Sequence, residues 1–324
     1  MRADAAGSAD DDGLPQGLSA PAGRVWNDRH NFGTAPTVSP SHVQGQTLVF
    51  GPASRLPGDL HMSPLLSRIV VGGVGLPVVL GAVWLGGWWL LALTCVAAVI
   101  ALHELYWMTR SLRPLVLAGY AGALLSLVGA HLGGVEWMLA GFLATFALAF
   151  LLKGVAETRQ TTTVSVGTTV LGAGWIGFGL GHVLLLRDIP EHGTLAAFTV
   201  LLAVFASDTV AYFSGRLLGR HKLAPRTSPG KTWEGFIAGT VTGILVAFFA
   251  LYEQDFLDVW RSLVLGAVVA IAAPIGDLFE SAIKRDMNVK DSGRLLAAHG
   301  GVLDRIDAQL FASIAGFYAI LALS

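Results

Sequence analysis

Apolar stretches of about 20 residues recur along most of this sequence, and they constrain its fold more than any other feature. A helix needs about 20 residues to cross the ~30 Å hydrocarbon core of a membrane, and nine stretches are near that length. They cover residues 69–86, 88–107, 114–132, 136–152, 165–186, 194–214, 233–252, 261–281 and 306–323. With 53% hydrophobic and only 13% charged residues, the composition excludes an ordinary soluble domain. We therefore predict an all-α polytopic membrane protein with about nine transmembrane helices.

The Lys and Arg residues are unevenly divided among the segments that join these stretches. If the N-terminus lies in the cytoplasm, fourteen of the 21 Lys and Arg fall in the connections after the second, fourth, sixth and eighth stretches. Only Arg187 and Arg261 then fall on the opposite side. Cytoplasmic loops of membrane proteins carry such an excess of positive charge. The distribution predicts a cytoplasmic N-terminus and supports the number of crossings.

The densest group of charged residues runs from Asp277 to Asp307, between the last two apolar stretches. Charge buried in or beside hydrocarbon is costly unless it is paired or metal-bound, so such a group indicates a functional site. Asp304 and Asp307 are spaced i, i+3, and four polar residues before them share one helical face: Asp277, Glu280, Ser281 and Lys284. Two carboxylate faces with cations between them suit Mg²⁺ and phosphate. Pro274 and Gly276 also predict an interruption of the helix that aims Asp277 at a cavity.

A second polar block, residues 207–235, joins the sixth and seventh apolar stretches. Asp208, Tyr212 and Arg216 share one helical face, which places Asp208 toward the inside and Arg216 toward the mouth.

Part of this block, Gly230-Lys231-Thr232, is similar to the end of a phosphate-binding Walker A loop. That motif requires Gly where Pro225 stands, and a strand before it, so the similarity fails. A weaker prediction remains: Ser228, Lys231 and Thr232 lie at the start of a helix, where free N–H groups favour an anion.

The motifs of the first group, taken together, resemble the signature of the phosphatidate cytidylyltransferases, also called CDP-diacylglycerol synthases. They are Ser281-x-x-Lys284-Arg285, Lys290-Asp291-x-Gly293 and His299-Gly300-Gly301-x-x-Asp304-Arg305-x-Asp307, in this order and spacing. The 207–235 block is similar to the same family. Two positions depart from the pattern, because Ala297-Ala298 stand where the family usually has Pro-Gly, and Asn288 stands where it usually has Gly. Both are positions of loop shape rather than ligands.

The resemblance implies an integral membrane enzyme that joins CTP to phosphatidic acid, by in-line attack of the lipid phosphate on the CTP α-phosphorus. It implies a homodimer in a bacterial-type inner (cell) membrane, and the distribution of Lys and Arg predicts that the active site faces the cytoplasm. The resemblance also implies a metal centre at Asp277 and Asp304, with Mg²⁺ and a second cation such as K⁺. The expected partners are CTP, phosphatidic acid and membrane lipid, and no nucleic acid.

The composition and the positions of the motifs divide the chain into three predicted regions. Residues 1–67 are predicted to be a disordered cytoplasmic tail, because their first 60 are rich in Gly, Pro, Ser and Asp and lack apolar periodicity. Residues 68–190 are predicted to be a transmembrane scaffold in which dimer contacts could lie, and residues 191–324 the catalytic region.

The basic and glycine-containing positions are assigned to the substrate phosphates. Basic side chains bind phosphate oxygens, and glycine lets the backbone approach a phosphate closely. The predicted catalytic residues are Asp208, Asp277, Lys284, Arg285, Lys290 and Asp304. The predicted phosphate-binding residues are Lys222, Ser228, Lys231, Ser281, Lys284, Lys290, His299, Gly300 and Gly301.

Other interpretations remain open from the residues alone. A CTP-dependent polyprenol kinase would share the carboxylates and basic loops but yield CDP and a lipid monophosphate. A cation-coupled transporter would carry its acidic residues at mid-membrane in repeated halves, whereas this sequence shows no internal repeat. Of the remaining polar residues, His103 and Glu104 are interpreted as structural, with Glu104 capping a helix contact. The lone Cys95 is interpreted as a small buried hydrophobe.

Overall fold

The computed structural model describes residues 64–155, 161–293 and 300–324, which are almost entirely helical. The helices are α1 (Pro64–Leu85), α2 (Gly87–Met108), α3 (Val116–Val155), α4 (Thr162–Gly172), α5 (Gly179–Arg187), α6 (Gly193–Leu218), α7 (Trp233–Leu251), α8 (Val259–Asp286) and α9 (Leu303–Leu323). A 3₁₀ turn, η1 (Arg110–Leu112), follows α2, and a π-helical segment, η2 (Ala173–Phe178), joins α4 to α5. Strands β1 (Lys222–Ala224) and β2 (Ser228–Thr232) pair antiparallel in a hairpin between α6 and α7.

Seven helical segments in the described part of the chain are long and apolar enough to cross a membrane. They are α2, α3, the continuous Thr162–Arg187 segment, α6, α7, α8 and α9. In α1, Gly73–Leu85 form a further apolar helical segment. The predicted fold class, an all-α polytopic membrane protein, is confirmed. The number of nine crossings and the side of the N-terminus stay predictions. Of the predicted tail, residues 1–63 lie outside the described residues, and α1 begins at Pro64.

A bend inside α3 accounts for two of the predicted crossings. The backbone is not helical at Gly133, where φ is −147°, or at Gly134, where φ is 70°. The predicted stretches 114–132 and 136–152 lie on either side of this bend. A Cβ added at Gly141 would lie 2.5 Å from backbone atoms of the first arm. The two arms of α3 therefore fold back on each other at a distance that small residues permit.

The predicted interruption of the helix before Asp277 is wrong. α8 continues from Val259 to Asp286 through Pro274. Proline removes one backbone N–H, but α7 and α9 both pack along α8 and hold it in place. Asp277 therefore projects from an intact helix.

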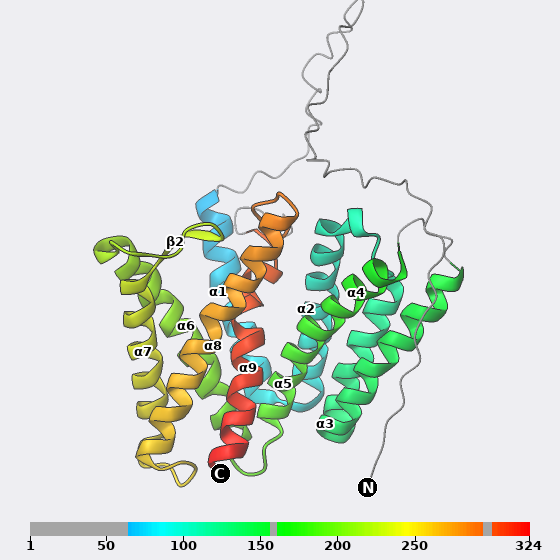
Figure 1. The fold of residues 1–324 in the computed structure, drawn as a ribbon. Helices are drawn as coiled ribbons and strands as arrows, with labels where there is room; N and C mark the ends of the chain where they lie inside the picture. Colours follow the sequence, from blue (N-terminus) through cyan, green and yellow to red (C-terminus); the bar gives the residue numbers. More distant parts are fainter. Residues whose placement is uncertain (1–63, 156–160, 294–299) are drawn as a thin grey trace, which may run out of the picture. The chain divides into compact units, whose positions relative to one another are not determined.

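Helices α6 to α9 form one packed group that carries the polar motifs. α7 packs against α6 and α8, and α8 packs against α9. In Figure 1, β2, the end of α8 and the start of α9 lie at the end of the bundle where α1 begins, and the C-terminus lies at the opposite end. The sequence motifs around residues 208–231 and 277–307 thus meet at one end of the bundle.

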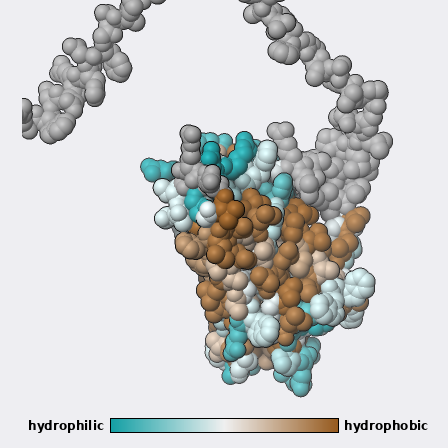
Figure 2. All heavy atoms as spheres, turned by 90° about the vertical axis from the view of Figure 1, so that its right-hand side faces the viewer, coloured by the Kyte–Doolittle hydropathy of each residue, from teal (hydrophilic) through white to brown (hydrophobic). Residues whose placement is uncertain are grey.

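The surface of the helical bundle is suited to lipid. Figure 2 shows hydrophobic residues filling the middle of one face and hydrophilic residues gathered toward its two ends. Large apolar side chains are exposed on several helices, including Leu117 and Phe150 of α3 and Phe249 of α7. Exposed apolar surface of this extent is unfavourable in water, whereas a membrane provides the apolar surroundings that it requires.

Candidate active site

Asp277 of α8 is held by a lysine from the hairpin. Lys231 Nζ lies 2.8 Å from Asp277 Oδ2 and also donates to the carbonyl oxygen of Pro274 at 3.3 Å. One turn further along α8, Ser281 Oγ donates to Asp277 Oδ1 at 3.3 Å. The predicted helical face is therefore formed. The side chain of Asp277 remains 40% exposed, so a further ligand can reach it.

Lys284 links α8 to α9 through two carboxylates. Its Nζ lies 2.7 Å from Asp304 Oδ1 and 3.1 Å from Glu280 Oε2. The side chains of Lys284 and Asp304 are each 13% exposed, and that of Glu280 is 1% exposed. Ion pairs shielded from water interact strongly, but each charge also loses its hydration. Removing Lys284 would leave both carboxylates without their shared cation, which is costly in a site shielded from water.

Backbone N–H groups fix the orientation of Asp304. The Gly301 N–H donates to Asp304 Oδ2 at 2.8 Å, and the Ser292 N–H donates to the same oxygen at 3.3 Å. Asp304 lies in the first turn of α9, where a negative charge interacts favourably with the helix dipole. Its carboxylate is thus positioned by the loop before α9 as well as by Lys284.

The chain leaves α8 through a turn at Asn288, one of the positions that departs from the family pattern. Asn288 has a left-handed φ of 56°. The Val289 N–H donates to the Lys284 carbonyl at 2.9 Å, and the Asn288 N–H donates to the Arg285 carbonyl at 3.0 Å. This pair of bonds ends many helices at a left-handed residue, usually Gly and sometimes Asn. The asparagine therefore preserves the turn.

Carboxylates outnumber lysines in this part of the structure. Asp208 of α6 interacts electrostatically with Asp277, Asp307 and Lys231. Glu280 interacts in the same way with Asp304 and Asp307. We call the following five residues the carboxylate cluster: Asp208, Asp277, Glu280, Asp304 and Asp307. Two lysines, Lys231 and Lys284, form ion pairs within it. This part of the structure thus has more carboxyl groups than lysines to pair with them.

The carboxylate cluster has the donor chemistry of a magnesium site but not yet its geometry. Among the described residues, no three His, Cys, Asp or Glu side chains are arranged to hold a metal ion. Asp277 and Asp304 each bind a lysine instead. Carboxylate oxygens are nevertheless the hard ligands that Mg²⁺ prefers, and the side chain of Asp277 is 40% exposed. The residues fit a cation, and its binding at Asp277 and Asp304 stays a prediction.

The hairpin carries basic residues to the end of α8. Arg285 Nε donates to the Thr227 carbonyl at 3.2 Å, so Arg285 and Lys231 both tie the hairpin to α8. Ser228 is partly buried, whereas Lys222 and Lys290 are exposed. Within the described residues, neither Lys222 nor Lys290 forms an ion pair with the carboxylate cluster. Their binding of phosphate stays a prediction.

Two N–H groups at the start of α7, predicted to favour an anion, already have partners. Thr232 Oγ1 accepts a hydrogen bond from the Gly235 N–H at 3.2 Å, and the Trp233 N–H donates to the His221 carbonyl at 2.9 Å. Capping of this kind satisfies the groups that an anion would otherwise bind.

The glycine motif before α9 is only partly described. His299 lies outside the described residues. Gly300 has a left-handed φ of 78°, a conformation that favours glycine. The Gly301 N–H donates to Asp304, and its approach to a substrate phosphate stays a prediction.

Comparison with known proteins gives a consistent result. The model of the cytidylyltransferase family matches residues 66–323. The chain belongs to the cytidylyltransferase family. The predicted resemblance and enzyme class are confirmed, and the chain is an integral membrane protein of this family.

Several relatives of the chain in this family are named phosphatidate cytidylyltransferase. The protein from Staphylococcus haemolyticus is 34% identical over 251 residues, covering 76% of this chain and 94% of the relative. The protein from Mycobacterium bovis is 32% identical over 283 residues, covering 80% of this chain and 89% of the relative. The protein from Bacillus subtilis is 37% identical over 183 residues, covering 56% of this chain and 68% of the relative.

One residue outside the family motifs contacts the site directly. Glu104 of α2 is 5% exposed, and it accepts hydrogen bonds from the Val302 and Leu303 N–H groups at 3.0 and 2.9 Å. Its interpretation as a structural cap is confirmed, but the sequence did not connect it to α9. The available signal was an acidic residue inside an apolar stretch. His103, beside it, is exposed and lies 3.2 Å from the Tyr120 hydroxyl.

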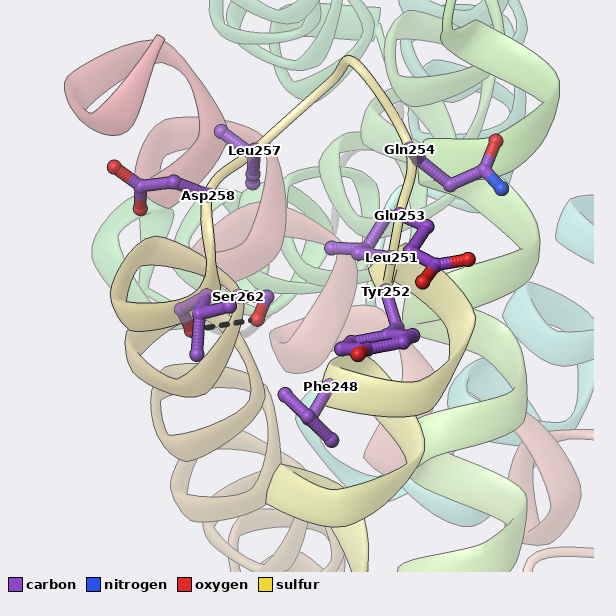
Figure 3. A pocket seen from close by; sticks show the side chains of 9 residues that line it. Phe248, Leu251, Tyr252, Glu253, Gln254, Leu257, Asp258 and Ser262 are labelled. Atoms are coloured by element: carbon purple, nitrogen blue, oxygen red, sulfur yellow. Dashed lines mark hydrogen bonds between the residues drawn. The ribbon is translucent and has the colours of Figure 1, made fainter.

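A small cavity lies at the other end of α7 and α8, away from the carboxylate cluster. Figure 3 shows Phe248 and Tyr252 between the two helices, at the connection that ends with Asp258. The cavity has a volume of about 180 Å³. None of the predicted site residues lines it, so we assign it no part in the chemistry.

Proposed function

We propose that this protein transfers the cytidylyl group of CTP to phosphatidic acid, giving CDP-diacylglycerol and pyrophosphate. The observation that carries the proposal is the similarity to relatives named phosphatidate cytidylyltransferase over about three quarters of the chain. The carboxylate cluster, with lysines from the hairpin and α8, supports it because the reaction brings two phosphate groups together.

The proposed reaction needs positioning and charge neutralisation rather than a covalent enzyme intermediate. An oxygen of the lipid phosphate attacks the α-phosphorus of CTP, the bond from that phosphorus to the leaving oxygen breaks, and pyrophosphate departs. In-line transfer of this kind is accelerated by holding the reactants and by neutralising the oxygens. Lys231, Lys284 and Arg285 perform the neutralisation, with Lys290 and Lys222 at the exposed edge. Asp208 and Ser281 orient the lysines and the bound phosphates.

Asp277 and Asp304 are proposed to hold Mg²⁺, with a second cation such as K⁺ in the same cluster. When bound, these ions supply positive charge that orients the phosphate oxygens and stabilises the leaving group. The surplus of carboxylates over lysines supports this assignment.

The active site is proposed to face the cytoplasm from a bacterial inner membrane. The excess of Lys and Arg in the connections at the same end as the hairpin supports this orientation. A site at that depth serves both substrates, because phosphatidic acid arrives laterally from the inner leaflet and CTP arrives from the aqueous side. The homodimer implied by the resemblance is also a proposal, and the mass of the purified protein in detergent tests it.

The decisive experiment supplies purified protein with labelled CTP and phosphatidic acid. We expect labelled CDP-lipid and pyrophosphate in the presence of Mg²⁺, and no product after chelation. Asp277→Asn and Asp304→Asn should each lower kcat by at least about 100-fold, because each removes a charge on which the transition state depends. CDP as the nucleotide product would replace the proposal with the polyprenol-type kinase. Cation flux without nucleotide turnover would replace it with the transporter.

A further inference from the structure

We propose that Glu104 of α2 is a positioning residue that holds the segment around Asp304 in its active arrangement. The proposal rests on the proposed function, because it assigns a purpose to the fixed orientation of Asp304. Glu104 lies in the predicted scaffold region, 200 residues before Asp304 in the sequence.

Glu104 is a buried carboxylate whose partners are N–H and O–H donors. Its Oε1 accepts from the Val302 N–H at 3.0 Å, and its Oε2 accepts from the Leu303 N–H at 2.9 Å. The Ser292 hydroxyl donates to Oε2 at 3.2 Å. A buried carboxylate is tolerated only where its charge is compensated. Here the compensation comes from three donors and from the N-terminal end of the α9 dipole.

The capping of α9 is thus supplied by another helix. Val302, at the N-cap position, offers no side-chain cap of its own. Helices leave their first N–H groups unsatisfied unless a side chain accepts them. Glu104 fills this position from α2, so the start of α9 is fixed relative to the scaffold region.

Glu104 also accounts for two glycines of the family motifs. A Cβ added at Gly293 would lie 2.6 Å from Glu104 Oε1, and one added at Gly301 would overlap Glu104 Oε2 and Ser292 Oγ. The carboxylate is therefore enclosed between two stretches of glycine backbone. Larger residues at either position would push Glu104 away from the N–H groups that it accepts.

The same loop residues connect Glu104 to Asp304. Ser292 donates its hydroxyl to Glu104 and its N–H to Asp304. Gly301, packed against Glu104, donates its N–H to Asp304 at 2.8 Å. The loop groups that orient Asp304 are therefore those that Glu104 immobilises. Small displacements of a reacting group can lower a rate by about 100-fold, so loosening this segment should reduce catalysis.

The test compares Glu104→Gln with a control on the same helix. Thr94→Val is suitable because Thr94 is buried in α2 and, within the described part of the chain, its hydroxyl donates to the Leu91 carbonyl of the same helix. Two measurements are made in lipid nanodiscs. Hydrogen exchange of peptides covering residues 288–293 and 300–305 is recorded without substrate, and kcat and KM are determined for CTP and phosphatidic acid.

In Glu104→Gln, the side-chain NH₂ group replaces one of the two oxygens that accept the Val302 and Leu303 N–H groups. One of these backbone donors then faces another donor and loses its hydrogen bond. We expect exchange in the 300–305 peptide to accelerate about tenfold or more, since a hydrogen bond to a charged group is lost. We expect kcat to fall about 10- to 100-fold, both KM values to stay within about threefold, and Thr94→Val to match wild type. Unchanged exchange, or a kcat within twofold of wild type, would overturn the proposal.

Ser292→Ala covers the case in which Glu104→Gln does not fold. It removes one donor to Glu104 and keeps the backbone bond to Asp304. We expect the same pattern at a smaller scale, with kcat about 3- to 10-fold lower, and a wild-type kcat beside accelerated exchange would refute the inference. If the wild-type protein makes no CDP-lipid, the proposed function fails and the catalytic purpose of Glu104 fails with it. The exchange data then still decide whether Glu104 holds the segment.

Discussion

Gly276 of α8 lies directly against the backbone of Asp307 in α9, with no side chain between the two helices. A Cβ added at Gly276 would overlap the Asp307 carbonyl oxygen and lie 3.2 Å from the Ala308 Cα. This contact sets how closely the two helices that carry most of the carboxylate cluster approach each other. The packing of α8 against α9 therefore sets the position of the α8 carboxylates relative to the α9 carboxylates.

Gly276→Ala is expected to separate α8 from α9 and to weaken the site. Overpacking of this kind costs about 1–3 kcal/mol, so thermal unfolding in detergent should occur at a lower temperature and CDP-lipid formation should fall at least tenfold. Gly81→Ala in α1 is the matched control, because its added Cβ meets nothing within 4 Å. Equal Tm values for the two variants would contradict the packing argument.

Lys284→Met is expected to be strongly destabilising. It leaves Glu280 and Asp304 shielded from water without their shared cation, and breaking a buried ion pair costs about 3–5 kcal/mol. Adding Glu280→Gln to Lys284→Met should recover part of this loss, because one of the unpaired charges is removed. Chemical denaturation of the single and double variants measures the recovery. A double variant less stable than the single would show that Lys284 does not act through Glu280.

Asn288 offers a test of the turn that ends α8. Asn288→Gly should preserve or slightly raise stability, since glycine adopts a left-handed φ without strain. Asn288→Val should lower it by about 1–2 kcal/mol, because a β-branched residue is strained at positive φ. The difference in Tm between the two variants is the measurement, and a valine variant as stable as the glycine variant would mean that the turn does not require this conformation.

Lys231→Gln should affect substrate binding more than folding. Lys231 is partly exposed, so its ion pair with Asp277 contributes little to stability, within about 1 kcal/mol. We expect KM for CTP to rise about tenfold or more as a phosphate contact is lost. Arg226→Gln, also in the hairpin connection and exposed, serves as the control for general loss of positive charge. A similar rise in KM for both variants would indicate long-range attraction rather than a specific contact.

The sequence predicted the fold class and the polar face of α8, because both depend on local patterns. Apolar length marks the helices, and the i, i+3, i+4, i+7 spacing placed four polar residues of α8 on one face: Asp277, Glu280, Ser281 and Lys284. The bend at Gly133 and Gly134 was likewise visible as a break between two apolar stretches. Such features depend on residues that are neighbours in the chain.

Features that depend on tertiary contacts were not predictable in this way. Proline at position 274 suggested a broken helix, but packing by α7 and α9 keeps α8 continuous. Glu104 was interpreted as a helix cap, but its partners lie almost 200 positions away, so the helix that it caps was not identified. The pairing of Lys231 with Asp277 joins two motifs whose relation no spacing reveals.

The ion pairs at Lys231 and Lys284 have a consequence for how ligands enter. Asp277 and Asp304, the carboxylates predicted to receive a cation, are each already paired with a lysine of the chain, so an incoming ion or phosphate would have to exchange partners with the protein. If Asp277 held Mg²⁺ as proposed, the Lys231 ammonium that now pairs with it would become available to the phosphate that accompanies the metal. Binding of nucleotide and metal should therefore be mutually reinforcing, and each should raise the apparent affinity for the other.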